Sequence, residues 1–360
     1  MDSNAPEAEA IVNSLRGTIL HVPNLLDIFE GWPIKENYHY ERITDIVEGA
    51  FDRSSSLRAK YRKANYARFV SLYYPHPEWE QVQTLTLYII WLFCWDDAID
   101  QQGTGDLSND LLRAKNHRDD TTRVLEHVLG LTRADQDEEP KLSDHSHVNA
   151  ELKTIGYELK KVYTHEQRQT FMTQVRRYIE NCHEEQTMRL HGTLPDIQSY
   201  NELRHGTAAV WTLCTLIEYG LTENIPEHIR YMGEIQTLWA ETSRGIWITN
   251  DILSLKKEIP KDGFTTESIV NAIPILMKEG RSPQEAVDSL LADLAASVAS
   301  FEAAAAVLKE AAGDEGRKVM EKYCDACRCM VTGSIQFTYE STRYQIAGCL
   351  NQDGSLSIML

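Results

Sequence analysis

Three aspartates follow the most apolar stretch of the chain, which runs from Thr84 to Trp95. On a helix, Asp96 and Asp100 lie one turn apart on the same face, and Asp97 lies beside them. Carboxylates at the edge of a core need an opposite charge, and the sequence places no lysine or arginine within a turn of them. The expected partner is a hard divalent cation bound through oxygen ligands. An acidic, solvated helix end is the alternative interpretation.

A second set of oxygen ligands is spaced along one helical stripe. Asn250, Ser254 and Glu258 follow one another at intervals of four residues, so an amide oxygen, a hydroxyl and a carboxylate line up over about 12 Å of a helix. Mg²⁺ is commonly held by a few protein oxygens together with substrate phosphates and water. The spacing therefore predicts a magnesium site, with a polar, exposed helix face as the alternative.

Together these two sets resemble the metal motifs of the class I terpene synthases, and of fungal sesquiterpene cyclases in particular. The run from Asp96 to Asp100 matches the aspartate-rich motif of that family. The nine residues from Asn250 to Glu258 match its second motif, NDxxSxxKE, at every defined position. The resemblance implies three Mg²⁺ ions, two near Asp96 and Asp100 and one on Asn250, Ser254 and Glu258.

Two further positions match the family pattern. Arg204 lies 46 residues before Asn250, the offset of the diphosphate-sensing arginine, and Arg343 with Tyr344 forms the C-terminal arginine–tyrosine pair. The resemblance implies that Arg204, Arg343 and Lys257 bind diphosphate oxygens while Tyr344 donates a hydrogen bond. With Asp96, the residues Arg204, Arg343 and Tyr344 are the expected catalytic set, because they stabilise charge on the leaving group.

After the diphosphate leaves, an allylic cation needs a dry cavity with aromatic faces. Phe93 precedes Asp96 by about one turn and is expected to line that cavity. Phe337 stands six residues before Arg343, where the family often has tryptophan. Phe69 and Trp211 are weaker candidates, because aromatic residues at helical spacing are often plain core.

The resemblance implies Mg²⁺-dependent ionisation and cyclisation of an isoprenoid diphosphate. Chain length and the lack of extra domains favour farnesyl diphosphate, giving a cyclic sesquiterpene hydrocarbon or alcohol. A diterpene cyclase acting on geranylgeranyl diphosphate would carry the same motifs. A prenyl diphosphate synthase would need a second aspartate-rich motif in place of residues 250–258. A non-catalytic helical interaction protein is disfavoured because every metal-motif position is intact.

Helices must position these residues. Apolar residues recur at helical spacing from Glu41 onward, which predicts an all-α bundle of about ten helices around a central cavity. One helix is expected from Trp79 to Asp100, after Pro77. Glycines and prolines predict breaks between later helices near residues 192–195, 220–226, 260–263 and 280–283. We expect a loose arm over 1–20 and a single domain over 21–360, with surface loops at about 101–120 and 132–147.

Two other patterns resemble zinc motifs without completing them. Cys324, Cys327 and Cys329 have the spacing of a zinc fragment, but no fourth ligand follows at the usual distance. The run from His183 to Glu185 lacks the second histidine of a zinc-protease helix.

Composition narrows the possible partners and location. A net charge of −18 argues against a nucleic-acid surface, which needs clustered lysine and arginine. No apolar run is long enough to suggest a membrane span, and the first twenty residues do not resemble a secretory signal. Seven cysteines without an export signal are expected as reduced thiols. We therefore expect a cytoplasmic protein, monomeric or homodimeric.

Overall fold

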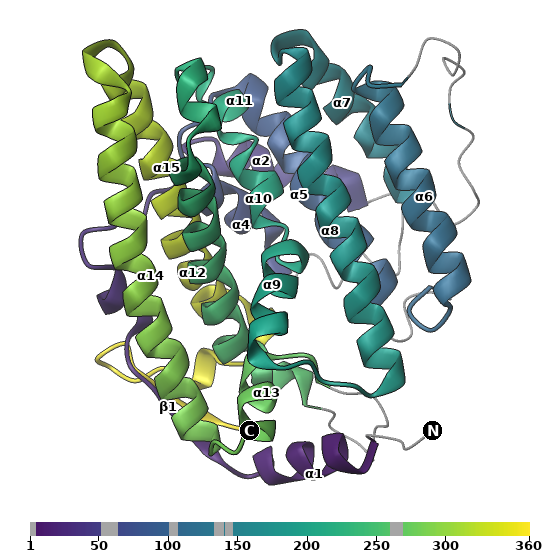
Figure 1. Ribbon diagram of the computed structural model, residues 1–360, viewed down its shortest axis with the longest axis vertical. Coiled ribbons are helices and arrows are strands. Elements are labelled where there is room, and N and C mark those ends of the chain that lie inside the picture. The colour runs from purple at the N-terminus through teal and green to yellow at the C-terminus, as the bar shows by residue number, and fades with distance from the viewer. Residues whose placement is uncertain (1–4, 52–63, 101–106, 133–139, 141–146, 260–268) are drawn as a thin grey trace.

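Long helices that run side by side make up most of the molecule (Figure 1). The computed structural model describes residues 5–51, 64–100, 107–132, 140, 147–259 and 269–360. The longest helices are α5 (Trp79–Asp100), α8 (His165–His191), α12 (Gly233–Glu258), α14 (Pro283–Ala311) and α15 (Gly313–Glu340). Their extent confirms the predicted all-α fold.

Shorter helices connect and cover the long ones. They are α1 (Ala5–Leu15), α2 (Tyr40–Phe51), α4 (Tyr66–Tyr73), α6 (Leu111–Val128), α7 (Glu151–Val162), α9 (Ile197–Thr207), α10 (Val210–Cys214), α11 (Ile217–Leu221) and α13 (Ala272–Lys278). Single 3₁₀ turns are η1 (Leu25–Phe29), η3 (His147–Ala150), η4 (Glu227–Tyr231), η5 (Thr342–Tyr344) and η6 (Ala347–Cys349).

Helix α5 has the predicted bounds and carries the aspartates inward. Trp91 and Trp95 are fully buried on it, and each indole N–H has a partner. Trp91 Nε1 donates to Asn149 Oδ1 at 3.1 Å, and Trp95 Nε1 donates to Thr121 Oγ1 at 2.8 Å. Because α5 is buried over most of its length, the residues that follow Trp95 enter the protein interior.

The predicted helix breaks coincide with capping residues. Gly192 ends α8 with a φ of 62°, a conformation that glycine adopts without strain. Ser282 begins α14 with a capping box to Glu285, and Pro283 occupies the first turn. The break expected at residues 260–263 lies outside the described residues.

The first twenty residues are not a loose arm where the structure describes them. Val12 and Leu15 on α1 are buried, so this helix packs against the body of the protein. Strand β1 (Ile19–Val22) then pairs antiparallel with β2 (Leu356–Met359), near the other end of the chain. No sequence pattern near β1 indicates its partner, which is more than 330 residues away.

The expected loop over residues 101–120 is wrong for its second half, because α6 begins at Leu111. Asp110 caps the helix by accepting the backbone N–H groups of Leu112 and Arg113, each at 3.0 Å. The first half of α6 is rich in charged and polar residues, so its sequence resembles that of a surface loop. Arg118 is buried and donates to Gln186 Oε1 of α8 at 2.9 Å. Most of the loop expected at 132–147 lies outside the described residues.

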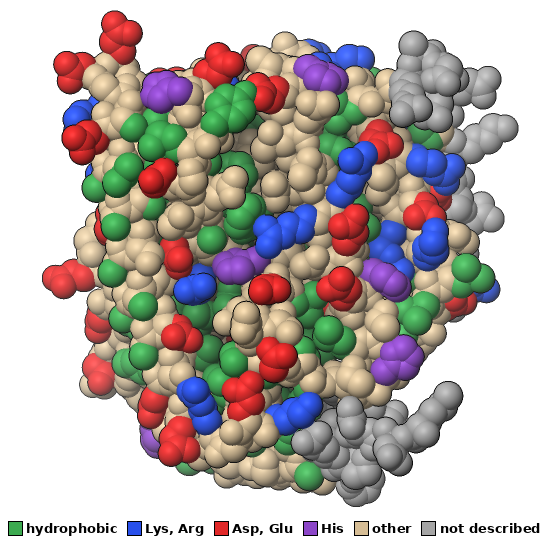
Figure 2. All heavy atoms as spheres, viewed as in Figure 1, with side chains coloured by type: hydrophobic (Ala, Val, Ile, Leu, Met, Phe, Trp, Pro, Cys, Tyr) green, Lys and Arg blue, Asp and Glu red, His purple; other side chains and the backbone are tan. Residues whose placement is uncertain are grey.

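One described helix, α14, has the length and apolar composition of a membrane span. One such helix is weak evidence for a membrane span, because core helices of soluble proteins have the same length and composition. Its apolar residues Leu290, Leu294 and Phe301 are buried, and α14 packs against α12 and α15. Figure 2 shows acidic and basic side chains interspersed over the face that α14, α12, α9 and α8 form.

Candidate active site

The end of α5 places two adjacent carboxylates in a partly closed environment. Asp97 is only 2% exposed, and Asp96 accepts a hydrogen bond from the hydroxyl of Tyr178 on α8 at 3.1 Å. Burial, and next the negative charge of Asp97, raises the pKa of Asp96 to about 6. Two neighbouring carboxylates held in this way are a suitable site for a cation. The side chain of Asp100 lies outside the described residues.

Arg343 faces these aspartates from the C-terminal segment. Its Nη2 lies 3.4 Å from Asp97 Oδ1, and its Nη1 donates to the hydroxyl of Tyr66 at 3.0 Å. The negative charge around Arg343 outweighs its burial and raises the pKa of the guanidinium above its usual range. Arg343 therefore stays charged beside the aspartate-rich motif.

The second motif lies on the last turns of α12, with its oxygen atoms along one stripe. Ser254 Oγ donates to Glu258 Oε1 at 2.5 Å, and the amide of Asn271 donates to Glu258 Oε2 at 3.0 Å. Asn250 Oδ1 lies 3.3 Å from Nη2 of Arg204. The stripe thus offers the hydroxyl, carboxylate and amide oxygens that the sequence predicts.

Arg204 lies on the last turn of α9, beside this stripe. Its Nη2 donates to Asp251 Oδ1 at 2.8 Å, and its Nη1 donates to Thr207 at 3.3 Å. Its buried Nε has no hydrogen-bond partner among the described residues. The helix stops soon afterwards, because Ala209 takes a left-handed φ of 56° before α10 begins.

Tyr344 connects the two motifs. Its hydroxyl accepts a hydrogen bond from the Asn250 amide at 3.5 Å, and the ammonium of Lys257 lies 4.8 Å from its ring centroid. Its neighbour Arg343 contacts Asp97 on α5. Two adjacent residues of the C-terminal segment therefore reach both predicted metal motifs.

Aromatic rings gather next to Arg343. Phe93 stacks on Tyr66 with centroids 4.3 Å apart and meets Phe69 edge-on at 5.0 Å. Phe69 also meets Phe337 edge-on at 5.1 Å. The Arg343 guanidinium carbon lies 5.9 Å from the Phe93 ring centroid. Three of the aromatic residues singled out from the sequence, Phe93, Phe69 and Phe337, thus form one cluster beside the charged residues.

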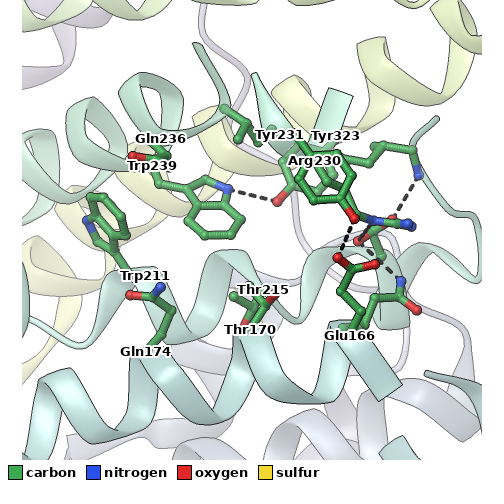
Figure 3. Close-up of a pocket in the computed structure, with 14 residues that line it drawn as sticks. Glu166, Thr170, Gln174, Trp211, Thr215, Arg230, Tyr231, Gln236, Trp239 and Tyr323 are labelled. Atoms are coloured by element: carbon green, nitrogen blue, oxygen red, sulfur yellow. Dashed lines mark hydrogen bonds and ion pairs between the residues drawn. The ribbon is translucent and has the colours of Figure 1, made fainter. Parts of the chain in front are cut away.

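Trp211, the fourth aromatic residue singled out from the sequence, lies outside this aromatic cluster. It lines a cavity of about 340 Å³ between α8, α10, η4 and α12, together with Trp239 (Figure 3). The two indole rings meet edge-on at 5.7 Å. The guanidinium of Arg177 lies over the Trp211 ring, 4.5 Å from its centroid. Trp211 is therefore part of this separate cavity and not of the cluster around Phe93.

Several residues near the site have no sequence signal of their own. Tyr178 and Glu185 lie on α8. Burial raises the pKa of Glu185 to about 6, although the charge of Arg204 opposes the shift. Tyr200 and Asn271 hold the second motif from α9 and the start of α13. Along the sequence, Glu185 belongs only to an incomplete zinc motif. Its charged neighbour Arg204 comes from another helix, α9.

Comparison with known proteins identifies the family of this chain. A family model described as terpene synthase family 2, C-terminal metal binding, matches residues 87–300, more than half of the chain. The chain belongs to the terpene synthase family. The matched region of this terpene synthase contains both metal motifs and Arg204, whereas Arg343 and Tyr344 lie beyond it.

Individual relatives agree with this membership. The terpene synthase is 29% identical over 351 residues to the sesquiterpene cyclase hepA of Aspergillus oryzae, covering 94% of this chain and 93% of that protein. It is 27% identical over 212 residues to a (+)-T-muurolol synthase of Roseiflexus castenholzii, named as farnesyl diphosphate cyclizing, covering 57% and 59%. A solved structure of hedycaryol synthase in complex with HEPES matches the fold with a TM-score of 0.72, at 17% identity and 88% and 98% coverage.

The residues of this terpene synthase fit a divalent metal, as its family implies. Asp96 and Asp97 are neighbouring carboxylates whose burial and mutual repulsion a cation would relieve. Ser254 and Glu258, about one and two turns beyond Asn250, lie in contact with each other. These donors are all oxygen atoms, which suits a hard cation better than a thiophilic one.

Proposed function

We propose that this terpene synthase catalyses the Mg²⁺-dependent ionisation and cyclisation of farnesyl diphosphate to a cyclic sesquiterpene, with release of diphosphate. The observation that carries the proposal is the position of Arg343 and Tyr344. Arg343 contacts Asp97 of the first motif, and Tyr344 contacts Asn250 of the second. A diphosphate held at these two side chains would lie between both metal motifs.

Metal ions bound at the two motifs, three Mg²⁺ in this proposal, would neutralise the diphosphate and stabilise it as a leaving group. The oxygen ligands are Asp96 and Asp100 on α5, and Asn250, Ser254 and Glu258 on α12. Burial and close spacing of like charges leave Asp96 poorly stabilised without a cation. The site therefore favours metal and diphosphate together over either one alone.

The cationic side chains bind and orient the diphosphate. Arg343 can form two parallel hydrogen bonds to phosphate oxygens, and its ionised state is secured by the surrounding negative charge. Arg204 has an Nε donor without a partner among the described residues. Lys257 and the hydroxyl of Tyr344 add donors at the second motif. Together these donors stabilise the charge that develops as the carbon–oxygen bond breaks.

The aromatic cluster receives the hydrocarbon part of the substrate. In this proposal Phe93 and Phe337, which both meet Phe69 edge-on, would present ring faces to the carbocation and help to exclude water that would quench it. Because Phe93 lies near Arg343, the cation would form next to the diphosphate that leaves.

Farnesyl diphosphate is the proposed substrate on two grounds. One relative that aligns over 94% of the chain is named a sesquiterpene cyclase, and another is named as cyclizing farnesyl diphosphate. The length of the chain also suits a single cyclase domain. Geranylgeranyl diphosphate is the alternative substrate, since it would use the same motifs.

The test is direct. Purified protein with farnesyl diphosphate and Mg²⁺ should release diphosphate and a cyclic C15 product, which gas chromatography with mass detection identifies. Parallel reactions with geranyl and geranylgeranyl diphosphate test chain length, and added isopentenyl diphosphate tests chain elongation. A linear, elongated diphosphate product would contradict the proposal.

Metal removal tests the cofactor separately. A chelator should abolish turnover, and Mg²⁺ in excess should restore it, because both clusters of acidic ligands need a cation to bind diphosphate. Full activity in chelator would rule out metal dependence.

A further inference from the structure

A cluster of metal-binding residue types lies far from the candidate active site. His76 stands in the turn between α4 and α5, and Asp325 and Cys329 stand one turn apart on α15. The imidazole, carboxylate and thiol donors all lie within 4.8 Å of one another. Asp96 lies 17 positions after Trp79, the first residue of α5 beyond this turn, which is about 26 Å of helix.

We propose that His76, Asp325 and Cys329 bind a zinc ion, with water as the fourth ligand, and that this ion fastens the turn before α5 to α15. Imidazole, thiolate and carboxylate are the usual protein ligands of zinc, and three of them with one open position form a common site. The thiolate disfavours Mg²⁺, so the metal of the active site would not compete here.

The state of His76 suits this role. His76 Nε2 is buried without a hydrogen-bond partner among the described residues, and it lies 4.0 Å from Asp325 Oδ2. Burial also lowers the pKa of His76, which favours the neutral imidazole that metals bind. In a tetrahedral zinc site the donor atoms are about 3.5 Å apart, so movements of about 1 Å in side chains would complete the geometry.

Two features oppose binding, and both can be measured. Burial raises the pKa of the Cys329 thiol to about 12, so the S–H proton must leave to solvent as the sulfur–zinc bond forms. Lys35 also forms an ion pair with the carboxylate that the metal would bind, with Nζ 2.5 Å from Asp325 Oδ2. The Lys35 side chain is 43% exposed, so it can turn outward into water when a divalent ion enters.

Other charges near the cluster have partners of their own. Lys322 pairs with Glu223 at 2.7 Å, and Arg328 pairs with Glu302 through two hydrogen bonds at 2.8 and 2.7 Å. A weaker contact of 3.9 Å joins Arg328 to Asp325. Lys35 is therefore the main competitor of the metal at Asp325.

Cobalt(II) provides the test, because it replaces zinc and gives a thiolate charge-transfer absorption band. Metal-free, full-length protein is titrated with Co²⁺ in the presence of Mg²⁺, and Zn²⁺ is then added to displace the cobalt. We expect the band in wild-type protein and its loss in Cys329→Ser. His76→Gln should weaken binding by at least about tenfold. The matched control is Cys324→Ser, which removes another buried thiol of α15 outside the cluster.

Lys35→Met tests the competition. Removing the ammonium should tighten Zn²⁺ binding by about threefold. Zn²⁺ should also raise the Tm of wild type and Cys324→Ser but not of Cys329→Ser. If Cys329→Ser fails to fold, the substitution at the partly exposed His76 carries the same test. No cobalt–thiolate band in wild-type protein, a band that survives Cys329→Ser, or unchanged affinity in Lys35→Met would overturn the proposal.

Discussion

Arg204 and Asp251 form a buried ion pair, with Arg204 Nη2 2.8 Å from Asp251 Oδ1 and side-chain exposures of 14% and 3%. Asp251 also accepts hydrogen bonds from the Tyr200 hydroxyl at 2.6 Å and from the backbone N–H of Ala272 at 3.0 Å. Its carboxylate is thus surrounded by donors from α9 and α13. Within the second motif, Asp251 holds Arg204 in place, while Asn250, Ser254 and Glu258 are the proposed metal ligands.

This pair predicts the effect of Asp251→Asn. The substitution keeps the shape of the side chain but removes the carboxylate that is hydrogen-bonded to the guanidinium of Arg204. We expect the free energy of unfolding, measured in urea, to fall by about 3 kcal/mol, and turnover to fall with it. Asp293→Asn on the exposed face of α14 is the control. Equal stability of the two variants would show that the pair contributes little.

Glu258→Gln tests the second metal motif. It preserves the size of the side chain and its capacity to bond Ser254 and Asn271, but it removes the negative charge that a metal needs. Turnover is expected to fall by at least about 100-fold, and half-maximal rate should require more Mg²⁺. The exposed Glu310→Gln should behave as wild type. Wild-type kinetics in Glu258→Gln would exclude this carboxylate as a ligand.

Phe93→Leu tests the aromatic cluster. Leucine nearly fills the space but has no ring face, so diphosphate release should persist while the mixture of products shifts. Diphosphate and hydrocarbons are assayed separately. Phe301→Leu, a buried aromatic that packs on Trp32, is the control. If both variants give the wild-type products, Phe93 is a packing residue only.

His205 predicts a pH dependence of stability. Burial, followed by the charges of Arg244 and Arg177, lowers the pKa of His205 from 6.5 to about 4. Between these two pH values the unfolded chain binds more protons than the folded protein, so the free energy of unfolding falls as pH falls through this window. The loss attributable to His205 is up to about 3 kcal/mol.

His205→Gln should remove this part of the slope, as measured by denaturant unfolding at several pH values between 4 and 7. The exposed His165→Gln serves as the control and should leave the slope unchanged. A slope that is the same in wild type and His205→Gln would contradict the shift.

The sequence by itself determined features that depend on neighbours along one helix. The bounds of α5 follow from a proline before it and a continuous apolar run within it. The stripe of Asn250, Ser254 and Glu258 follows from helical periodicity, which places every fourth residue on nearly the same face. The break at Gly192 follows from the backbone freedom of glycine. These are local properties, and the structure agrees with them.

Only the tertiary structure decided what depends on partners distant in the chain. It paired β1 with β2 and placed Trp211 in a cavity separate from Phe93. It buried Arg118 of α6 against Gln186 of α8. It also made Asp251 an anchor for Arg204 and brought Cys329 to His76. In each case the hydrogen-bond or packing partner comes from another helix or strand. The direction in which a side chain faces is set by the packing of the elements, which periodicity within one segment does not specify.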